Sequence, residues 1–310
     1  MPHCLNSGRT RWKVARTCAA VLAAFLLGGT AVGSAQTIPP DVKSAVAFVF
    51  APKSDGSLGP VGTGFFAGVK HAEKDFVTFY FVTAKHVLQA EGGRGFRPTL
   101  YIRVNTKDGK TDMLSTRLIT NGTGKTLFLH PDPSVDLAVI PGGPDPAKHE
   151  FKVVTDDLIT TKTEYQRLQI GEGSEVFFAG LFWQFVGEHR NHPIVRFGRV
   201  ALVTDERITW NGVKTDLYLI ESGAYGGNSG APVFFYLGPE RIPGSLVVGP
   251  RVLKLAGIIQ GNFGDVEPIV AIETARVPMA RANVGIAAVV PAYKLHEILF
   301  SPDLTAHRRY

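Results

Sequence analysis

Three short segments contain the residue types of a nucleophilic site. Ser229 lies in the glycine-rich segment Gly226–Val233, and glycine beside a serine lets the backbone turn sharply and bring two N–H groups into one small space. His86 stands at the end of an apolar run, and Asp136 opens another. A serine hydroxyl needs a base within hydrogen-bond reach, and that base needs a buried acid to fix its tautomer. The three residue types together point to acyl transfer through a serine nucleophile.

Each segment also has a purely structural explanation. A single histidine at a strand end is usually a structural residue, an aspartate at a strand start is common turn chemistry, and a glycine-rich segment is equally a hairpin turn. Asp132 lies close enough in the chain to compete with Asp136, but only Asp136 leads directly into an apolar run. The order His, Asp, Ser excludes the α/β-hydrolase plan, and Ala231 replaces the last glycine of its Gly-x-Ser-x-Gly turn.

Short apolar or alternating runs recur along the chain, and turn residues such as Asn211-Gly212 separate many of them. Even spacing of this kind is typical of an all-β barrel or sandwich. The expected strands are Ala45–Phe50, Gly62–Ala67, Phe76–Thr83, Leu100–Val104, Leu127–Leu129, Leu137–Ile140, Val176–Leu181, Ile194–Val203, Asp216–Ile220, Ala231–Phe235, Leu253–Gln260 and Val284–Val290.

A proline- and glycine-rich break at Pro141–Pro144 divides these runs into two sets. We therefore expect two six-stranded units, the first over about residues 40–143 and the second over about residues 150–290. Pro291 precedes Leu295, Ile298 and Leu299 at helical spacing. This pattern predicts a short C-terminal helix over Pro291–Phe300.

The charge balance argues against nucleic-acid binding. The chain has 310 residues, of which 45% are apolar and 19% charged, as expected for a folded globular protein. Its net charge of +6 is concentrated in residues 1–35, which hold four basic and no acidic side chains, so the remainder has a net charge of +2. A nearly neutral body lacks the basic surface that binds nucleic acid.

Residues 1–35 have the pattern of a secretory signal. A basic stretch that ends at Arg16 precedes the apolar run Ala19–Leu27, and Gly33 and Ala35 are the small residues before an expected cleavage site ahead of Gln36. The alternative is an uncleaved membrane anchor, but the run is short for a helix that spans ~30 Å of hydrocarbon, and no later segment is apolar enough to span a membrane. The two cysteines, at positions 4 and 18, both lie in the signal. An exported chain without disulfides suits a bacterial periplasmic or extracellular protein.

Three blocks of the sequence resemble the signature blocks of the chymotrypsin-like (trypsin-fold) serine peptidases: Thr83–Val87, Asp136–Val139 and Gly227–Pro232. Asp136 follows His86 by 50 residues and Ser229 follows Asp136 by 93, which are ordinary separations in that family. The similarity extends over about residues 45–300. It implies one peptidase domain at residues 36–310, built from two six-stranded antiparallel β-barrels with the three residues in the cleft between them.

The resemblance also implies a role for each residue. Ser229 is the expected nucleophile, His86 the general base and then acid, and Asp136 the residue that orients His86. The N–H groups of Gly227 and Ser229 are the expected oxyanion hole. The implied activity is that of a serine endopeptidase, which acts on protein or peptide substrates and requires no cofactor.

One departure from the family bears on activation. Asn228 stands where many animal members have an aspartate that pairs with a newly cut N-terminus. Asparagine is neutral and cannot make that ion pair, so activation by insertion of an N-terminus is not expected. The asparagine and the absence of cysteines after residue 35 point to the bacterial branch, which includes the Deg-type and glutamyl endopeptidase catalytic domains.

The resemblance places Ser222, Gly223 and Ala224, together with Ile259, in the specificity pocket. None of the four is acidic, which disfavours a lysine or arginine in the pocket because a buried cation would lack a partner. Ile259 stands where glutamyl endopeptidases have a histidine, which argues against glutamate. We therefore expect a small or medium apolar residue before the scissile bond.

Two further expectations complete the prediction. His189 and His192 have no third ligand nearby in the sequence, so no metal site is expected.

The alternative to an active enzyme is a binding or scaffold module of the cell envelope that has the same fold and is catalytically silent or latent. The pattern leaves the oligomeric state open.

Overall fold

The computed structural model describes residues 38–71, 76–122, 124–239, 250–268 and 279–308. Residues Pro39–Tyr310 pack as one compact unit, which contains every element described below. The predicted signal at residues 1–35, with both cysteines, lies outside the described residues. Within the described ranges, none of the helices has the length and apolar character needed to cross a membrane.

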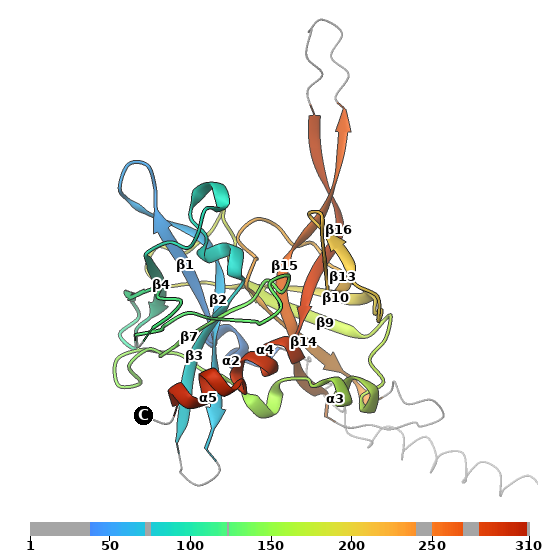
Figure 1. Cartoon of the computed structure of the whole chain (residues 1–310), viewed down its shortest axis with the longest axis horizontal. Helices are drawn as coiled ribbons and strands as arrows, with labels where there is room; N and C mark the ends of the chain where they lie inside the picture. Colours follow the sequence, from blue (N-terminus) through green and yellow to red (C-terminus); the bar gives the residue numbers. More distant parts are fainter. Residues whose placement is uncertain (1–37, 72–75, 123, 240–249, 269–278, 309–310) are drawn as a thin grey trace, which may run out of the picture. The chain divides into compact units, whose positions relative to one another are not determined.

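Eight strands form the first sheet (Figure 1). Their order along the sheet is β5-β4-β1-β2-β3-β7-β6, with antiparallel neighbours, and β8 pairs in parallel with β2. The strands are β1 (Val46–Pro52), β2 (Leu58–Lys70), β3 (Val77–Thr83), β4 (Thr99–Asn105), β5 (Thr111–Arg117), β6 (Phe128–Leu129), β7 (Ala138–Pro141) and β8 (Val154–Thr155).

The two outer strands of the first sheet, β5 and β6, are connected by a turn and do not pair as neighbouring strands. Among the described strands, β5 and β6 do not pair with each other. The carbonyl of Ile119, just after β5, accepts hydrogen bonds from the N–H groups of Thr126 (2.9 Å) and Leu127 (3.0 Å), just before β6. The unit therefore differs from the expected six-stranded barrel, because β6 has only two residues and is too short to form a ladder with β5.

The second unit is a closed six-stranded barrel in the order β10-β13-β16-β15-β14-β9. Together with the first sheet it confirms the predicted all-β fold class. The strands are β9 (Glu175–Gly180), β10 (Ile194–Leu202), β13 (Tyr218–Glu221), β14 (Pro232–Leu237), β15 (Val252–Pro268) and β16 (Met279–Pro291). Two short strands, β11 (Ile208–Trp210) and β12 (Val213–Thr215), form a separate hairpin around Asn211-Gly212.

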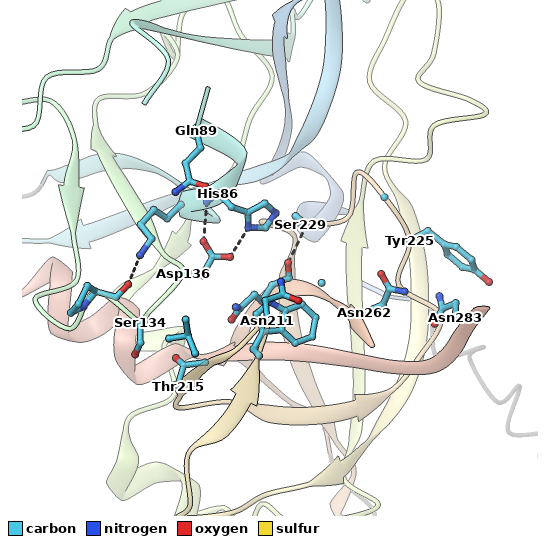
Figure 2. Close-up of a pocket in the computed structure, with 17 residues that line it drawn as sticks. His86, Gln89, Ser134, Asp136, Asn211, Thr215, Tyr225, Ser229, Asn262 and Asn283 are labelled. Atoms are coloured by element: carbon cyan, nitrogen blue, oxygen red, sulfur yellow. Dashed lines mark hydrogen bonds and ion pairs between the residues drawn. The ribbon is translucent and has the colours of Figure 1, made fainter. Parts of the chain in front are cut away.

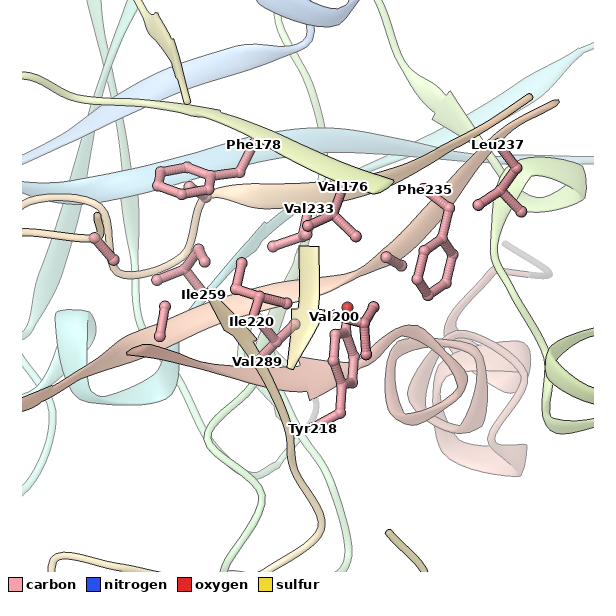
Figure 3. Packing of buried hydrophobic residues seen from close by; sticks show 14 residues of the cluster. Val176, Phe178, Val200, Tyr218, Ile220, Val233, Phe235, Leu237, Ile259 and Val289 are labelled. Atoms are coloured by element: carbon pink, nitrogen blue, oxygen red, sulfur yellow. The ribbon is translucent and has the colours of Figure 1, made fainter. Parts of the chain in front are cut away.

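Side chains from all six barrel strands fill the barrel (Figure 3). Alternation along β9 sends Val176 and Phe178 to the inner face, where both are fully buried. Phe177 points to the opposite face and stacks on Phe234, with ring centroids 5.4 Å apart. Because Phe177 is also fully buried, this part of the barrel wall is covered on both faces.

The helices are short. The predicted C-terminal helix is confirmed as α4 (Ala292–Leu299), with Pro291 directly before its first turn. Three other α-helices and three 3₁₀ helices were not predicted: α2 (Pro40–Ser44), α3 (Lys162–Arg167), α5 (Pro302–Arg308), η1 (Lys85–Leu88), η2 (Glu91–Gly93) and η3 (Asp156–Leu158). The sequence contains a signal for α3, because Thr161 and Glu164 form a capping box.

We expect Phe178→Ala to lower the free energy of unfolding by about 3–5 kcal/mol, because it leaves a cavity in the barrel core. Urea unfolding followed by circular dichroism measures the change. Phe185→Ala is the matched control, since 58% of the Phe185 side chain is exposed, and its effect should stay within about 0.5 kcal/mol. Equal destabilisation by the two variants would contradict this packing.

Candidate active site

His86 is held at the end of a buried strand. Strand β3 ends at Thr83, and η1 (Lys85–Leu88) turns the chain so that Val87 and Leu88 pack into the core. This anchoring leaves the His86 side chain 43% exposed, in the cleft described below. A rigid backbone with an accessible ring is the arrangement that a general base requires.

Asp136 binds His86 through both carboxylate oxygens (Figure 2). Oδ2 lies 2.5 Å from His86 Nδ1, and Oδ1 accepts the backbone N–H of His86 at 2.9 Å. Asp136 is buried two residues before β7, and Lys85 Nζ holds its loop by donating to the carbonyls of Pro133 (2.6 Å) and Val135 (3.1 Å). The carboxylate therefore fixes both the position and the ring orientation of His86.

The environment of His86 changes its pKa in two directions. Burial against the protein lowers the pKa, while the hydrogen bond and the negative charge of Asp136 raise it. The two effects of Asp136 outweigh burial, so the net result is a raised pKa. His86 is therefore a stronger base than a free imidazole, and it is lost as a base when the pH falls through this raised pKa.

Ser229 reaches the same cleft from the loop between β13 and β14. Its hydroxyl donates to the carbonyl of Gln260 at 3.2 Å. In the described part of the chain, no hydrogen bond joins Ser229 Oγ to His86. The three predicted residues are thus brought to one cleft, where Asp136 and His86 are bonded to each other and Ser229 is bonded to a backbone carbonyl (Figure 2).

The segment Tyr225–Ala231, here called the serine loop, is fixed by buried hydrogen bonds. The side chain of Asn228 accepts from the N–H of Tyr225 (2.8 Å) and donates to the carbonyl of Leu181 (2.7 Å). The N–H of Gly230 donates to the carbonyl of Ile259 at 2.8 Å. Asn228 therefore uses both ends of its amide to shape the loop, a role that needs no N-terminal ion pair.

The backbone of the serine loop leaves two donors open. The N–H of Asn228 donates to the carbonyl of Tyr225 (3.0 Å), which closes a four-residue turn. Within this turn Gly227 has a φ of +87°, whereas the φ of Gly226 is not positive. This combination is typical of a type II turn. Among the described residues, no acceptor is found for the N–H groups of Gly227 and Ser229. Both predicted oxyanion donors therefore remain available to a ligand.

The cleft itself has a volume of about 850 Å³. His86, Asp136 and Ser229 line one part of it, and the hairpin β11–β12 lines another through Trp210, Asn211, Val213 and Thr215. Trp210 packs edge-on against Phe263, with ring centroids 4.8 Å apart. The sequence predicted the turn at Asn211-Gly212. It could not predict that this turn contributes to the cleft wall, because the hairpin pairs with neither large sheet.

The specificity pocket predicted at Ser222, Gly223, Ala224 and Ile259 stays a prediction, and none of these residues lines the cleft described above. Ser222 is buried and donates to the carbonyl of Phe197 (3.0 Å), and Ala224 and Ile259 belong to the barrel core. The described cleft lining includes none of them, nor Gly223. Beside Ser229 the lining consists of other residues: Tyr225, Gly226, Gln260, Gly261, Asn262 and Asn283.

The described residues contain no group of three histidine, cysteine, aspartate or glutamate side chains arranged to hold a metal ion. His189 and His192 therefore have no third ligand of these types in that part of the chain. Their loop contributes instead to packing, as the His192 ring lies 5.6 Å from that of Phe185.

Comparison with known proteins gives resemblances in structure alone. No protein-family model and no curated protein matches the chain. The protease domain of MamO from Magnetospirillum magneticum (apo form) is 18% identical with a TM-score of 0.47, over 83% of this chain and 97% of that one. A serine-to-alanine mutant of Rv3671c from M. tuberculosis H37Rv, in an inactive form, is 16% identical with a TM-score of 0.41. The match covers 87% of this chain and 90% of that one. Human heparin binding protein is 11% identical with a TM-score of 0.42, and the match covers 86% of this chain and 96% of that one.

We expect Asp136→Asn to lower the pKa of His86 below its ordinary value of about 6.5, because burial then acts without the opposing charge. Titration of the His86 ring by NMR measures the pKa. Asp132→Asn is the matched control, since Asp132 binds Ser134 and Arg207 and makes no bond to His86. A pKa of His86 that stays raised in Asp136→Asn would contradict the geometry described above.

Proposed function

We propose that this chain is an exported serine endopeptidase that hydrolyses peptide bonds through an acyl-enzyme. The bond of 2.5 Å between His86 Nδ1 and Asp136 in the cleft that Ser229 also lines is the observation that carries the proposal. The two open N–H groups of the serine loop support it, because they supply the donors that acyl transfer needs. The predicted signal at residues 1–35 supports export to the periplasm or the outside of a bacterial cell.

In this mechanism, Asp136 holds the proton of His86 on Nδ1 and leaves Nε2 free to accept one. Ser229 Oγ attacks the substrate carbonyl while its proton passes to Nε2, and the N–H groups of Gly227 and Ser229 bind the resulting oxyanion. His86 then gives the proton to the leaving amine. A water molecule, activated by His86, hydrolyses the acyl-enzyme and restores Ser229. No step requires a cofactor.

One observation favours the alternative function, a latent or catalytically silent binding module of the cell envelope. The Ser229 hydroxyl donates to Gln260 O and not to His86 in this structure. An active enzyme must exchange that bond for one to His86 Nε2. Hydrogen bonds of this kind are often made only in the substrate complex. A latent enzyme would make the exchange only when a partner binds.

We expect an uncharged residue before the scissile bond, small or medium and apolar. Apart from Asp136, which is bonded to His86, no acidic side chain is found among the described residues that line it, so a substrate lysine or arginine has no partner there. Asn262 and Asn283 are among the uncharged polar side chains that line the cleft beside Ser229. Cleavage of a peptide library in which charged residues dominate before the cut would refute this preference.

A fluorophosphonate probe should label the folded mature chain on Ser229, because the probe requires an activated serine. Mass spectrometry locates the adduct. Ser229→Ala should abolish labelling, and His86→Ala should slow it by about 10²–10⁴-fold. Ser134 provides the matched control, since it lines the same cleft but is hydrogen-bonded to Arg207, so Ser134→Ala should still be labelled. A folded chain that is not labelled at all would favour the latent or silent module.

Gly227→Ala should reduce labelling by about 10²-fold, the effect of losing one oxyanion donor. Alanine is strained at φ +87°, and its Cβ would lie 2.4 Å from Trp183 Nε1, so the turn must move. Gly226→Ala is the matched control, because Gly226 lacks positive φ and its nearest neighbour would lie at 3.5 Å. Labelling rates should fall much less in this variant, and an equal loss in both would argue against a specific role for the Gly227 N–H.

A further inference from the structure

A second cavity, of about 540 Å³, lies beside the serine loop. Tyr225 and Gly226 line both this cavity and the cleft of Ser229, so the two spaces share a wall. The other walls are largely apolar and include Leu181 and Trp183. Arg196, from β10, is the one charged side chain among the described residues that line it. A single cation in an apolar cavity is a strong determinant of what can bind there.

The guanidinium of Arg196 has no acceptor in the described part of the chain. Its Nε is fully buried without a hydrogen-bond partner, and no hydrogen bond or ion pair is found for its other nitrogens. Arg207 differs, because it binds the carboxylates of Asp132 and Asp216. A buried donor without an acceptor is unfavourable, and in native proteins it often marks a place where a ligand or water completes the bonding.

The orientation of Arg196 suits a planar anion. The guanidinium carbon lies 4.8 Å from the centroid of the Tyr225 ring, so the aromatic face supports one side of the cation. A guanidinium presents its N–H groups as a planar fork that matches the two oxygens of a carboxylate. The amide of Asn228 is already occupied by Tyr225 and Leu181, so it does not compete for such a ligand.

We propose that this second cavity binds a carboxylate, and that the carboxylate belongs to an acidic side chain of the peptide substrate. The source of the carboxylate rests on the proposed function. Because Tyr225 and Gly226 separate the cavity from the cleft of Ser229, a peptide in the cleft has side chains within reach of Arg196. The enzyme then selects an acidic residue at one fixed position near the scissile bond, in addition to the uncharged residue in the main cleft.

The carboxylate site is tested without turnover, in the Ser229→Ala chain. The probes are acetyl-glutamate amide and its neutral isostere acetyl-glutamine amide, and the readout is the indole N–H resonance of Trp183, which lines the cavity. We expect the glutamate probe to bind at least about tenfold more tightly, the effect of one charge-assisted bidentate contact. A second substitution, Arg196→Gln, should remove this difference, and Arg196→Lys should restore part of it because lysine lacks the planar fork.

Arg199→Gln is the matched control. Arg199 lies on the same strand, three residues further along, and is exposed, so its loss changes the net charge equally and leaves the cavity intact. The preference for the glutamate probe should persist in this variant. Equal binding of the two probes, or equal losses in Arg196→Gln and Arg199→Gln with both variants folded by circular dichroism, would overturn the carboxylate site.

The source of the carboxylate is tested by cleavage of a peptide library with the wild-type chain. An acidic residue enriched at one position relative to the cut, and lost in Arg196→Gln, is the expected result. If the glutamate probe binds through Arg196 but cleavage shows no acidic preference, the carboxylate comes from a separate effector and the substrate assignment is wrong. If the probe binds but the fluorophosphonate labels nothing, the proposed peptidase function fails while the carboxylate site stands.

Discussion

Thr63, on β2, joins the serine loop to the strand that leads to His86. It is fully buried, and its hydroxyl donates to the carbonyl of Gly227 (2.6 Å) while accepting the N–H of Leu181 (3.0 Å). Its own N–H donates to the carbonyl of Ser229 (2.9 Å), and its carbonyl accepts the Thr83 hydroxyl (2.6 Å). Thr83 is the last residue of β3, three residues before His86. The relative position of His86 and Ser229 therefore depends on one small residue, which makes two of these bonds through its backbone and two through its buried side chain.

Local patterns were sufficient for much of this arrangement. The apolar run before His86 is β3, the run that Asp136 opens contains β7, and the helix after Pro291 is α4. Each of these elements is identified by residues that are close together in the chain, which is why short-range periodicity finds them. The same reasoning selected His86, Asp136 and Ser229, and the structure brings all three to one cleft. Their roles in catalysis remain part of the proposed function.

Long-range contacts account for what the sequence pattern missed. Thr63 is separated from Gly227 by 164 residues, and nothing in the neighbourhood of Thr63 signals that contact. The resemblance to a family placed Ile259 in the specificity pocket, but the alternation of strand faces turns Ile259 into the barrel core while its neighbour Gln260 lines the cleft. A shift of one residue exchanges the two faces of a strand, so approximate alignment to a family cannot assign such positions.

The two walls of the cleft are held by different forces. Buried hydrogen bonds fix the serine loop, whereas ion pairs fix the hairpin β11–β12. Arg207, which precedes the hairpin, binds Asp132 and Asp216. Asp216, which follows the hairpin, also binds the buried Lys294 of α4 at 2.9 Å. Asp132 belongs to the loop that leads to Asp136, so the same pairs link the hairpin to the support of His86. Because Arg207 is 41% exposed, these contacts are weakened by salt, unlike the bonds of Thr63. Salt therefore weakens the contacts of the hairpin β11–β12 more than the buried hydrogen bonds of the serine loop.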